Sequence, residues 1–152
     1  MEIERKYLLK KLPEHLEKYP HHKIEQGYLC TEPVVRIRRW DDSYILTYKS
    51  KGLMAREEYN LPLTEEAYLH LKSKADGIII EKVRYQIPFG KYTVELDIFE
   101  KDLATLTLAE VEFESIEEAN RFVPPEWFGE DVTYDSRYHN STLSQKKVLD
   151  RE

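Results

Sequence analysis

Pairs of charged side chains recur along this sequence, with one residue between the members of each pair. The series begins at the N-terminus, where Glu2, Glu4 and Lys6 follow one another at a spacing of two. Because successive side chains of a β-strand point to opposite faces, residues at this spacing point the same way. The opening strand is therefore expected to direct two carboxylates and one ammonium group to one face, and most of its apolar residues to the other.

The two signs of charge are separated by strand. The carboxylate pairs are Glu2-x-Glu4, Glu95-x-Asp97 and Glu110-x-Glu112. The cations lie in Arg36-x-Arg38, Thr47-x-Lys49 and Lys82-x-Arg84, and Arg56-x-Glu58 is a mixed pair. A face that merely meets solvent would intersperse the two signs. The separation instead indicates metal cations held on one side and a polyanion bound on the other.

This pattern fits a metal–phosphate ligand. Carboxylate oxygens suit hard ions such as Mg²⁺ or Mn²⁺, which proteins typically bind together with substrate phosphates. The side chains that could neutralise a chain of phosphates are Arg36, Arg38, Lys49, Arg56, Lys82 and Arg84. On any single strand the charged face would ordinarily be the solvent face. The predicted helices, however, have apolar stripes that need the outer face of a barrel, so the charges are expected to line a wet interior.

Alternation and turn signals predict eight strands, over residues 2–9, 23–30, 34–40, 43–50, 55–63, 78–88, 91–100 and 105–114. Helices are predicted over residues 10–19, from Thr64 to Asp76-Gly77, and from Ser115 to Pro124. We predict an α+β fold, a closed eight-stranded antiparallel β-barrel built from two β-α-β-β-β halves, with the helices packed outside. A single domain is expected over residues 1–152, with an ordered core of about 1–143 and a polar tail over 144–152.

Composition narrows the class of protein. The net charge of −6 argues against a nucleic-acid partner. No apolar run approaches the ~20 residues of a membrane span, so no membrane association is expected. The single cysteine, Cys30, cannot form an internal disulfide; it is expected in the core and suits a cytoplasmic location. The sequence leaves the oligomeric state open, and a homodimer is compatible with it.

In their order along the chain, these motifs resemble the CYTH superfamily, the triphosphate tunnel metalloenzymes. The segment Glu2-Ile3-Glu4-Arg5-Lys6 is similar to the E-x-E-x-K signature of that family, and the charged pairs described above follow it. Gln26-Gly27-Tyr28-Leu29 and Tyr138-x-Asn140 look like the small bacterial members that hydrolyse inorganic tripolyphosphate. The resemblance implies a tunnel of eight antiparallel strands, with triphosphate lying along its basic wall and Lys6 among the residues that bind it.

The resemblance also implies roles for individual residues. One or two divalent ions would be bound by Glu2, Glu4, Glu95, Asp97, Glu110 and Glu112. A metal-associated water would attack a terminal phosphorus, oriented by Glu110 or Glu112. Related thiamine-triphosphatase-like enzymes suggest a catalytic lysine–tyrosine pair, for which Lys49 and Tyr28 are the candidates.

Three functions follow as hypotheses. The leading one is metal-dependent hydrolysis of inorganic tripolyphosphate to pyrophosphate and phosphate, with nucleoside or thiamine triphosphates as alternative substrates. A class IV-type adenylate cyclase would use the same tunnel but needs a site for adenine and ribose, and we find no dedicated base-reading motif. A non-catalytic polyphosphate-binding module would not require the complete set of acidic pairs.

Overall fold

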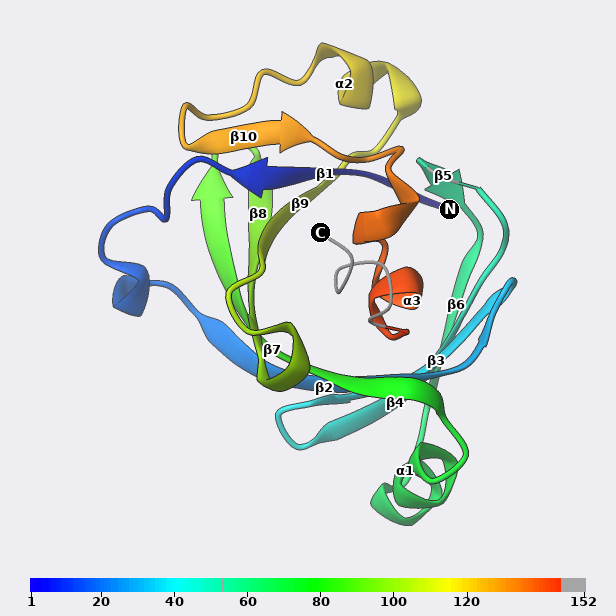
Figure 1. The fold of residues 1–152 in the computed structure, drawn as a ribbon. Coiled ribbons are helices and arrows are strands. Elements are labelled where there is room, and N and C mark those ends of the chain that lie inside the picture. The colour runs from blue at the N-terminus through cyan, green and yellow to red at the C-terminus, as the bar shows by residue number, and fades with distance from the viewer. Residues whose placement is uncertain (53, 146–152) are drawn as a thin grey trace.

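One antiparallel sheet curls into a nearly closed barrel (Figure 1). The computed structural model describes residues 1–52 and 54–145. The strands are β1 (Glu2–Leu9), β2 (His21–Thr31), β3 (Val34–Trp40), β4 (Ser43–Lys49), β5 (Ala55–Arg56), β6 (Glu58–Pro62), β7 (Asp76–Phe89), β8 (Tyr92–Glu100), β9 (Thr107–Glu112) and β10 (Phe128–Asp131). The α-helices are α1 (Glu65–Lys72), α2 (Ile116–Arg121) and α3 (Asn140–Leu143). Three short 3₁₀ segments are η1 (Leu16–Lys18), η2 (Lys101–Leu103) and η3 (Ser136–Tyr138).

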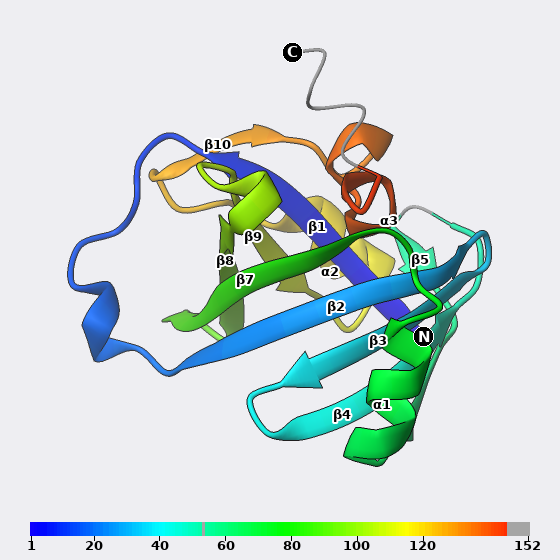
Figure 2. The same cartoon turned by 60° about the horizontal axis from the view of Figure 1, so that its bottom comes forward.

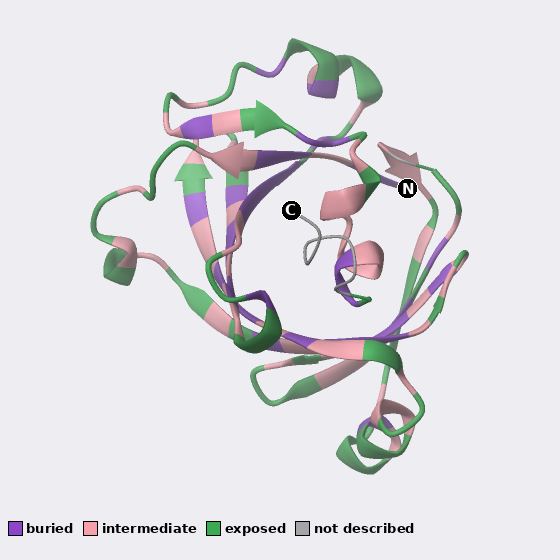
Figure 3. Cartoon of the chain, viewed as in Figure 1, coloured by how far each residue is buried: buried purple, intermediate pink, exposed green. Residues whose placement is uncertain are grey.

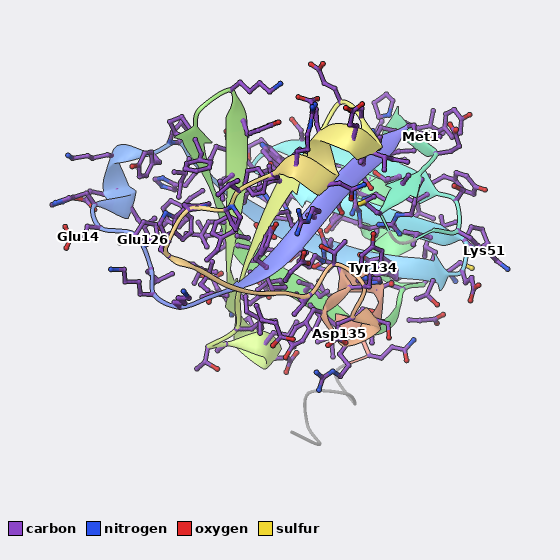
Figure 4. The ribbon with its side chains drawn as sticks, turned by 90° about the horizontal axis from the view of Figure 1, so that it is seen from above. Met1, Glu14, Lys51, Glu126, Tyr134 and Asp135 are labelled. Carbon is purple, nitrogen blue, oxygen red and sulfur yellow. The ribbon has the colours of Figure 1, made fainter. Side chains whose placement is uncertain are left out.

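The barrel closes through β1. The sheet has the order β10-β1-β9-β8-β7-β2-β3-β4-β6, and the first residues of β1 also pair with β5. Since β5 is followed after one residue by β6, the ring of strands returns to its start. Seen from above, β1 crosses the molecule from Met1, on the side of Lys51, toward the side of Glu14 and Glu126 (Figure 4). Pairing on both edges leaves β1 little free edge that could pair with another chain.

The predicted antiparallel barrel is confirmed, and each predicted strand overlaps an observed one. The fifth predicted strand is divided at Glu57 into β5 and β6. The predicted caps of two helices are also present. Thr64 Oγ1 accepts a hydrogen bond from the Ala67 amide at 3.1 Å, and Ser115 Oγ accepts one from the Glu118 amide at 3.1 Å. Each cap satisfies an amide that has no partner within its own helix.

Three expectations were wrong. The predicted helix over residues 10–19 is a loop with the single turn η1, because Leu12 is exposed and only Leu16 and Tyr19 pack partly against the barrel, too few contacts to stabilise so short a helix. The two halves therefore do not share one β-α-β-β-β pattern. Strand β10 lies in a segment where no strand was predicted, and it pairs with β1. Cys30 is exposed on β2 and does not belong to the core.

The inner face of the barrel changes from charged to apolar along its length. Ile80, Phe99 and Leu108 lie at even spacing from the charged residues of β7, β8 and β9, and they form a buried cluster with Leu143 of α3. Helices α1 and α2 pack outside the barrel, as predicted, but α3 lies over one of its ends (Figures 1 and 2). The apolar cluster and α3 thus close that end of the interior.

A second apolar cluster supports the barrel from outside. Tyr7 of β1 and Leu96 of β8 pack there with Phe122, which follows α2, and Phe128 of β10. Buried residues accordingly run along both faces of the strands, whereas much of α1 and the outer loops is exposed (Figure 3). In the described ranges no helix is long and apolar enough to cross a membrane.

Candidate functional site

The interior of the barrel holds a cavity of about 250 Å³. All the predicted site residues except Lys82 and Asp97 line it, namely Glu2, Glu4, Lys6, Tyr28, Arg36, Arg38, Lys49, Arg56, Arg84, Glu95, Glu110 and Glu112. The alternation of each strand turns these side chains inward, and closure of the sheet brings them together. The structure therefore gathers residues that are spread over more than a hundred positions of the sequence.

One wall of the cavity is rich in carboxylates. Strands β1 and β9 are neighbours, with Glu4 opposite Glu112 and Lys6 opposite Glu110. Burial, together with the nearby Glu110 and Glu2 carboxylates, raises the pKa of Glu4 to about 8. Burial and the carboxylates around it also raise the pKa of Glu112. The raised pKa values follow from burial first and from the crowding of carboxylates on this wall second.

The carboxylate wall is partly neutralised by side chains of the protein. Glu2 Oε2 lies 2.9 Å from Lys49 Nζ, and Glu110 Oε1 lies 3.9 Å from Lys6 Nζ and 3.6 Å from an Arg84 nitrogen. Although burial opposes it, Lys6 and Arg84 hold the pKa of Glu110 well below its usual range. Glu2 Oε1 and Glu110 Oε1 are nevertheless buried without a hydrogen-bond partner among the residues that the structure describes.

These carboxylates suit a hard divalent cation by their chemistry, because Mg²⁺ and Mn²⁺ prefer oxygen ligands. Over residues 1–52 and 54–145, however, no three Asp, Glu, His or Cys side chains are already grouped as ligands for one ion. Lys49 and Lys6 lie between the carboxylates and would have to give up part of these contacts when an ion binds. The residues that could then hold the ion are Glu2, Glu4, Glu110 and Glu112. Glu95 of β8, which lies opposite Glu110 of β9, could contribute as well.

The opposite wall carries two arginines without a counterion. Within the described part of the chain, neither Arg36 nor Arg38 forms an ion pair, and Arg36 Nε is buried without a hydrogen-bond partner. The pKa of Arg38 is lowered to about 9. The larger cause is the burial of the guanidinium group, and the smaller one is repulsion by Arg36 and Arg84. A buried positive charge without a partner is costly, and an anion in the cavity would supply the missing charge.

Lys82 and Asp97 lie behind this cavity and do not line it. Asp97 is 1% exposed and receives two hydrogen bonds from Arg84, at 2.7 and 2.8 Å. Lys82 Nζ lies 2.7 Å from the same carboxylate, and burial lowers the pKa of Lys82 to about 7. With two cations already bound to Asp97, the structure places this pair as a support for Arg84. The predicted metal and phosphate roles of these two residues stay predictions.

The proposed lysine–tyrosine pair faces the same cavity. Tyr28 is 2% exposed and lies in the lining, and Lys49 belongs to the lining as well. The ammonium group of Lys49 contacts Glu2 at 2.9 Å and Glu58 at 3.5 Å, and Arg56 reaches Glu2 at 3.7 Å. Lys49 is thus held by carboxylates, and its partnership with Tyr28 stays a prediction.

Part of the lining comes from the segment after β10, which sequence reasoning largely missed. Thr133, His139 and Ser141 line the cavity together with Asn140, and Lys6 Nζ donates to the Tyr138 carbonyl oxygen at 2.9 Å. No periodic pattern marks this segment, so only the resemblance of Tyr138-x-Asn140 to the family pointed to it.

Comparison with known proteins agrees with this geometry. The profile of the CYTH domain matches residues 1–146. An inorganic triphosphatase of Nitrosomonas europaea is 40% identical over 149 residues, which cover 94% of this chain and 96% of that protein. An inorganic triphosphatase of Acetivibrio thermocellus is 37% identical over 123 residues, or 78% of this chain and 77% of that protein. The crystal structure of an inorganic triphosphatase matches with a TM-score of 0.71 and 36% identity, covering 95% of each chain. The resemblance inferred from the motifs is confirmed: the chain belongs to the CYTH domain family.

Proposed function

We propose that this protein is a divalent-cation-dependent hydrolase that cleaves inorganic tripolyphosphate to pyrophosphate and phosphate. The observation that carries the proposal is the pairing, across one cavity, of a wall of carboxylates with Arg36 and Arg38, which form no ion pair with any described residue. A triphosphate with a divalent cation supplies what each wall lacks. The names of the two curated relatives point to the same substrate.

In this proposal one wall of the cavity binds the phosphate chain and the other binds the divalent cation. Arg36 and Arg38 bind the phosphate chain, because guanidinium groups present paired donors to phosphate oxygens. A divalent cation held by the carboxylates, Mg²⁺ or Mn²⁺, would withdraw charge from the transferred phosphoryl group and acidify a bound water. Glu110 or Glu112 accepts a hydrogen bond from the attacking water and orients it.

Lys49 is placed between the two walls. It contacts Glu2 and Glu58 on one side and faces the cavity on the other. If Glu2 were bound to a divalent cation, the Lys49 ammonium group would be free to contact the substrate or to exchange a proton with Tyr28. The cytoplasmic location and the homodimer considered from the sequence stay predictions.

One assay tests the proposal. Tripolyphosphate and ATP are offered in turn with Mg²⁺ or Mn²⁺, and phosphate, pyrophosphate and cyclic AMP are measured. Phosphate and pyrophosphate released from tripolyphosphate support the proposal. Cyclic AMP with pyrophosphate from ATP would instead identify an adenylate cyclase, and tight binding without turnover would identify a binding module.

A pair of variants ties the activity to this cavity. Glu4→Ala removes a carboxylate from the lining and is expected to abolish turnover while leaving the fold intact. Glu57→Ala removes an exposed carboxylate that does not line the cavity and should retain the wild-type rate. A near-normal rate in Glu4→Ala would show that the acidic wall is not the active site.

A further inference from the structure

Gln26 is a fully buried polar residue that sequence reasoning assigned to no role. It lies on β2 directly opposite Arg38 on β3, and its relative exposure is 0%. Gln26 Oε1 accepts a hydrogen bond from Arg38 Nε at 2.8 Å. The bond uses Nε, the guanidinium nitrogen nearest the aliphatic part of the side chain. The two terminal nitrogens of Arg38, Nη1 and Nη2, therefore remain available to the cavity that the residue lines.

The choice of an amide at this position is unusual within the barrel. Four of the other five cations of the lining are bound to carboxylates: Lys49 to Glu2, Lys6 to Glu110, Arg56 to Glu2 and Arg84 to Asp97. Gln26 offers a neutral oxygen instead. A neutral acceptor fixes the direction of the guanidinium but cancels none of its charge, whereas a carboxylate would cancel the charge and compete with a bound anion.

The other end of the Gln26 side chain shows that the amide is not chosen for stability. Gln26 Nε2 is buried and has no hydrogen-bond partner among the described residues. Leaving a buried donor unpaired is unfavourable, because the group loses its hydrogen bonds to water and gains none in return. A glutamate would replace this donor by a second acceptor oxygen and would form an ion pair with Arg38.

We propose that Gln26 is a positioning residue, which holds Arg38 with a neutral acceptor so that its charge and terminal nitrogens serve the substrate's phosphates. This inference rests on the proposed function, since it takes the anion in the cavity to be a polyphosphate. It predicts that the charge at position 26, and not only its shape, determines affinity for the substrate.

The test compares two substitutions of similar size. Gln26→Glu keeps the acceptor and adds a charge, and it is expected to raise KM for tripolyphosphate about 10- to 100-fold with a smaller change in kcat. Its unfolding midpoint should match or exceed that of the wild type. Gln26→Met removes the acceptor without adding charge, and is expected to raise KM less than Gln26→Glu does. Asn120→Asp, the same change of an amide to a carboxylate at an exposed position of α2 outside the lining, should leave KM unchanged.

A second measurement separates failure of this inference from failure of the proposed function. Calorimetric titration with tripolyphosphate reports affinity whether or not the wild type turns over. Weaker binding to Gln26→Glu than to Gln26→Met supports the inference even if no hydrolysis is seen. It is overturned if Gln26→Glu binds tripolyphosphate within threefold of the wild type, or if the wild type does not bind it.

Discussion

Arg84 donates two parallel hydrogen bonds to Asp97, from Nε to Oδ1 at 2.7 Å and from Nη2 to Oδ2 at 2.8 Å. The two residues are cross-strand neighbours on β7 and β8, and Lys82 binds the same carboxylate at 2.7 Å. Both oxygens of Asp97 are therefore occupied by cations of the protein. The carboxylate fixes the plane of the Arg84 guanidinium, which faces Glu95 and Glu110 in the cavity.

Asp97→Asn is accordingly expected to destabilise the fold. Removing one member of a buried ion pair leaves its partners uncompensated and costs about 3–5 kcal/mol. Glu95→Gln, on the same strand but partly exposed, should cost less than 1 kcal/mol. Urea denaturation of the metal-free protein measures both. If Asp97→Asn kept wild-type stability and lost only cation affinity, Asp97 would be a metal ligand and not a support for Arg84.

Arg36→Lys tests the phosphate-binding wall. Lysine keeps the positive charge but not the paired donors of a guanidinium, so KM for tripolyphosphate is expected to rise roughly tenfold, or about 1.4 kcal/mol. Arg39→Lys makes the same change on the same strand at an exposed position and should leave KM unchanged. Steady-state kinetics with both variants gives the comparison. Equal values of KM would place the substrate elsewhere than against Arg36.

The face of the sheet to which most site side chains point could be predicted, because residues at even spacing along a strand point to the same face. Arg36 and Arg38, or Glu110 and Glu112, must share a face once the strand is recognised, and closure of the sheet then turns that face inward. The partner of each residue could not be predicted in the same way. Asp97 contacts Arg84 and Lys82 and does not line the cavity. This arrangement depends on the register of β7 and β8 and on the depth of Asp97 within the barrel.

Elements that depend on distant partners were also beyond sequence reasoning. Strand β10 has no alternating pattern of its own and exists because the edge of β1 is available to it. Helix α3 covers the barrel because Leu143 fits the apolar cluster around Ile80 and Leu108. The helix predicted over residues 10–19 is reduced to the turn η1, in which Leu16 packs partly against the outer apolar cluster while Leu12 stays exposed.

The pairing of β10 with β1 makes stability depend on pH. Asp131 accepts hydrogen bonds from Arg5 and Thr133, which lower its pKa although partial burial opposes this. A lowered pKa stabilises the fold above the unfolded value of about 3.9, and the stabilisation is lost as the pH falls through the folded value. Asp131→Asn should therefore lower the unfolding midpoint at pH 7 but much less at pH 3.

The control for this pH dependence is Asp42→Asn, which changes a fully exposed carboxylate. The destabilisation by Asp131→Asn at pH 7 is expected to be about 1 kcal/mol or less, because the pair is partly exposed. Thermal unfolding at the two pH values gives both differences. An Asp131→Asn effect of the same size at pH 3 and pH 7 would show that the loss is one of packing and not of charge.

Two glycines with left-handed backbones allow a test of how α3 is held over the cavity. Gly77 has φ of 69° and a Cβ there would lie 2.3 Å from the Ser144 carbonyl oxygen, which accepts a hydrogen bond from the Ile78 amide. Gly90, in the hairpin between β7 and β8, has φ of 62° and nothing within 4 Å of such a Cβ. Alanine at Gly90 should cost only the strain of the backbone, about 1–2 kcal/mol.

Gly77→Ala adds a steric clash to the same backbone strain, so it should lower the unfolding midpoint more than Gly90→Ala does. Because the clash displaces Ser144, which directly follows α3, we also expect it to disturb the lining residues His139 and Asn140 and to raise KM. Gly90→Ala should leave KM unchanged. Denaturation and kinetics on the two variants separate the effects, and an unchanged KM in Gly77→Ala would mean that the position of α3 does not influence the site.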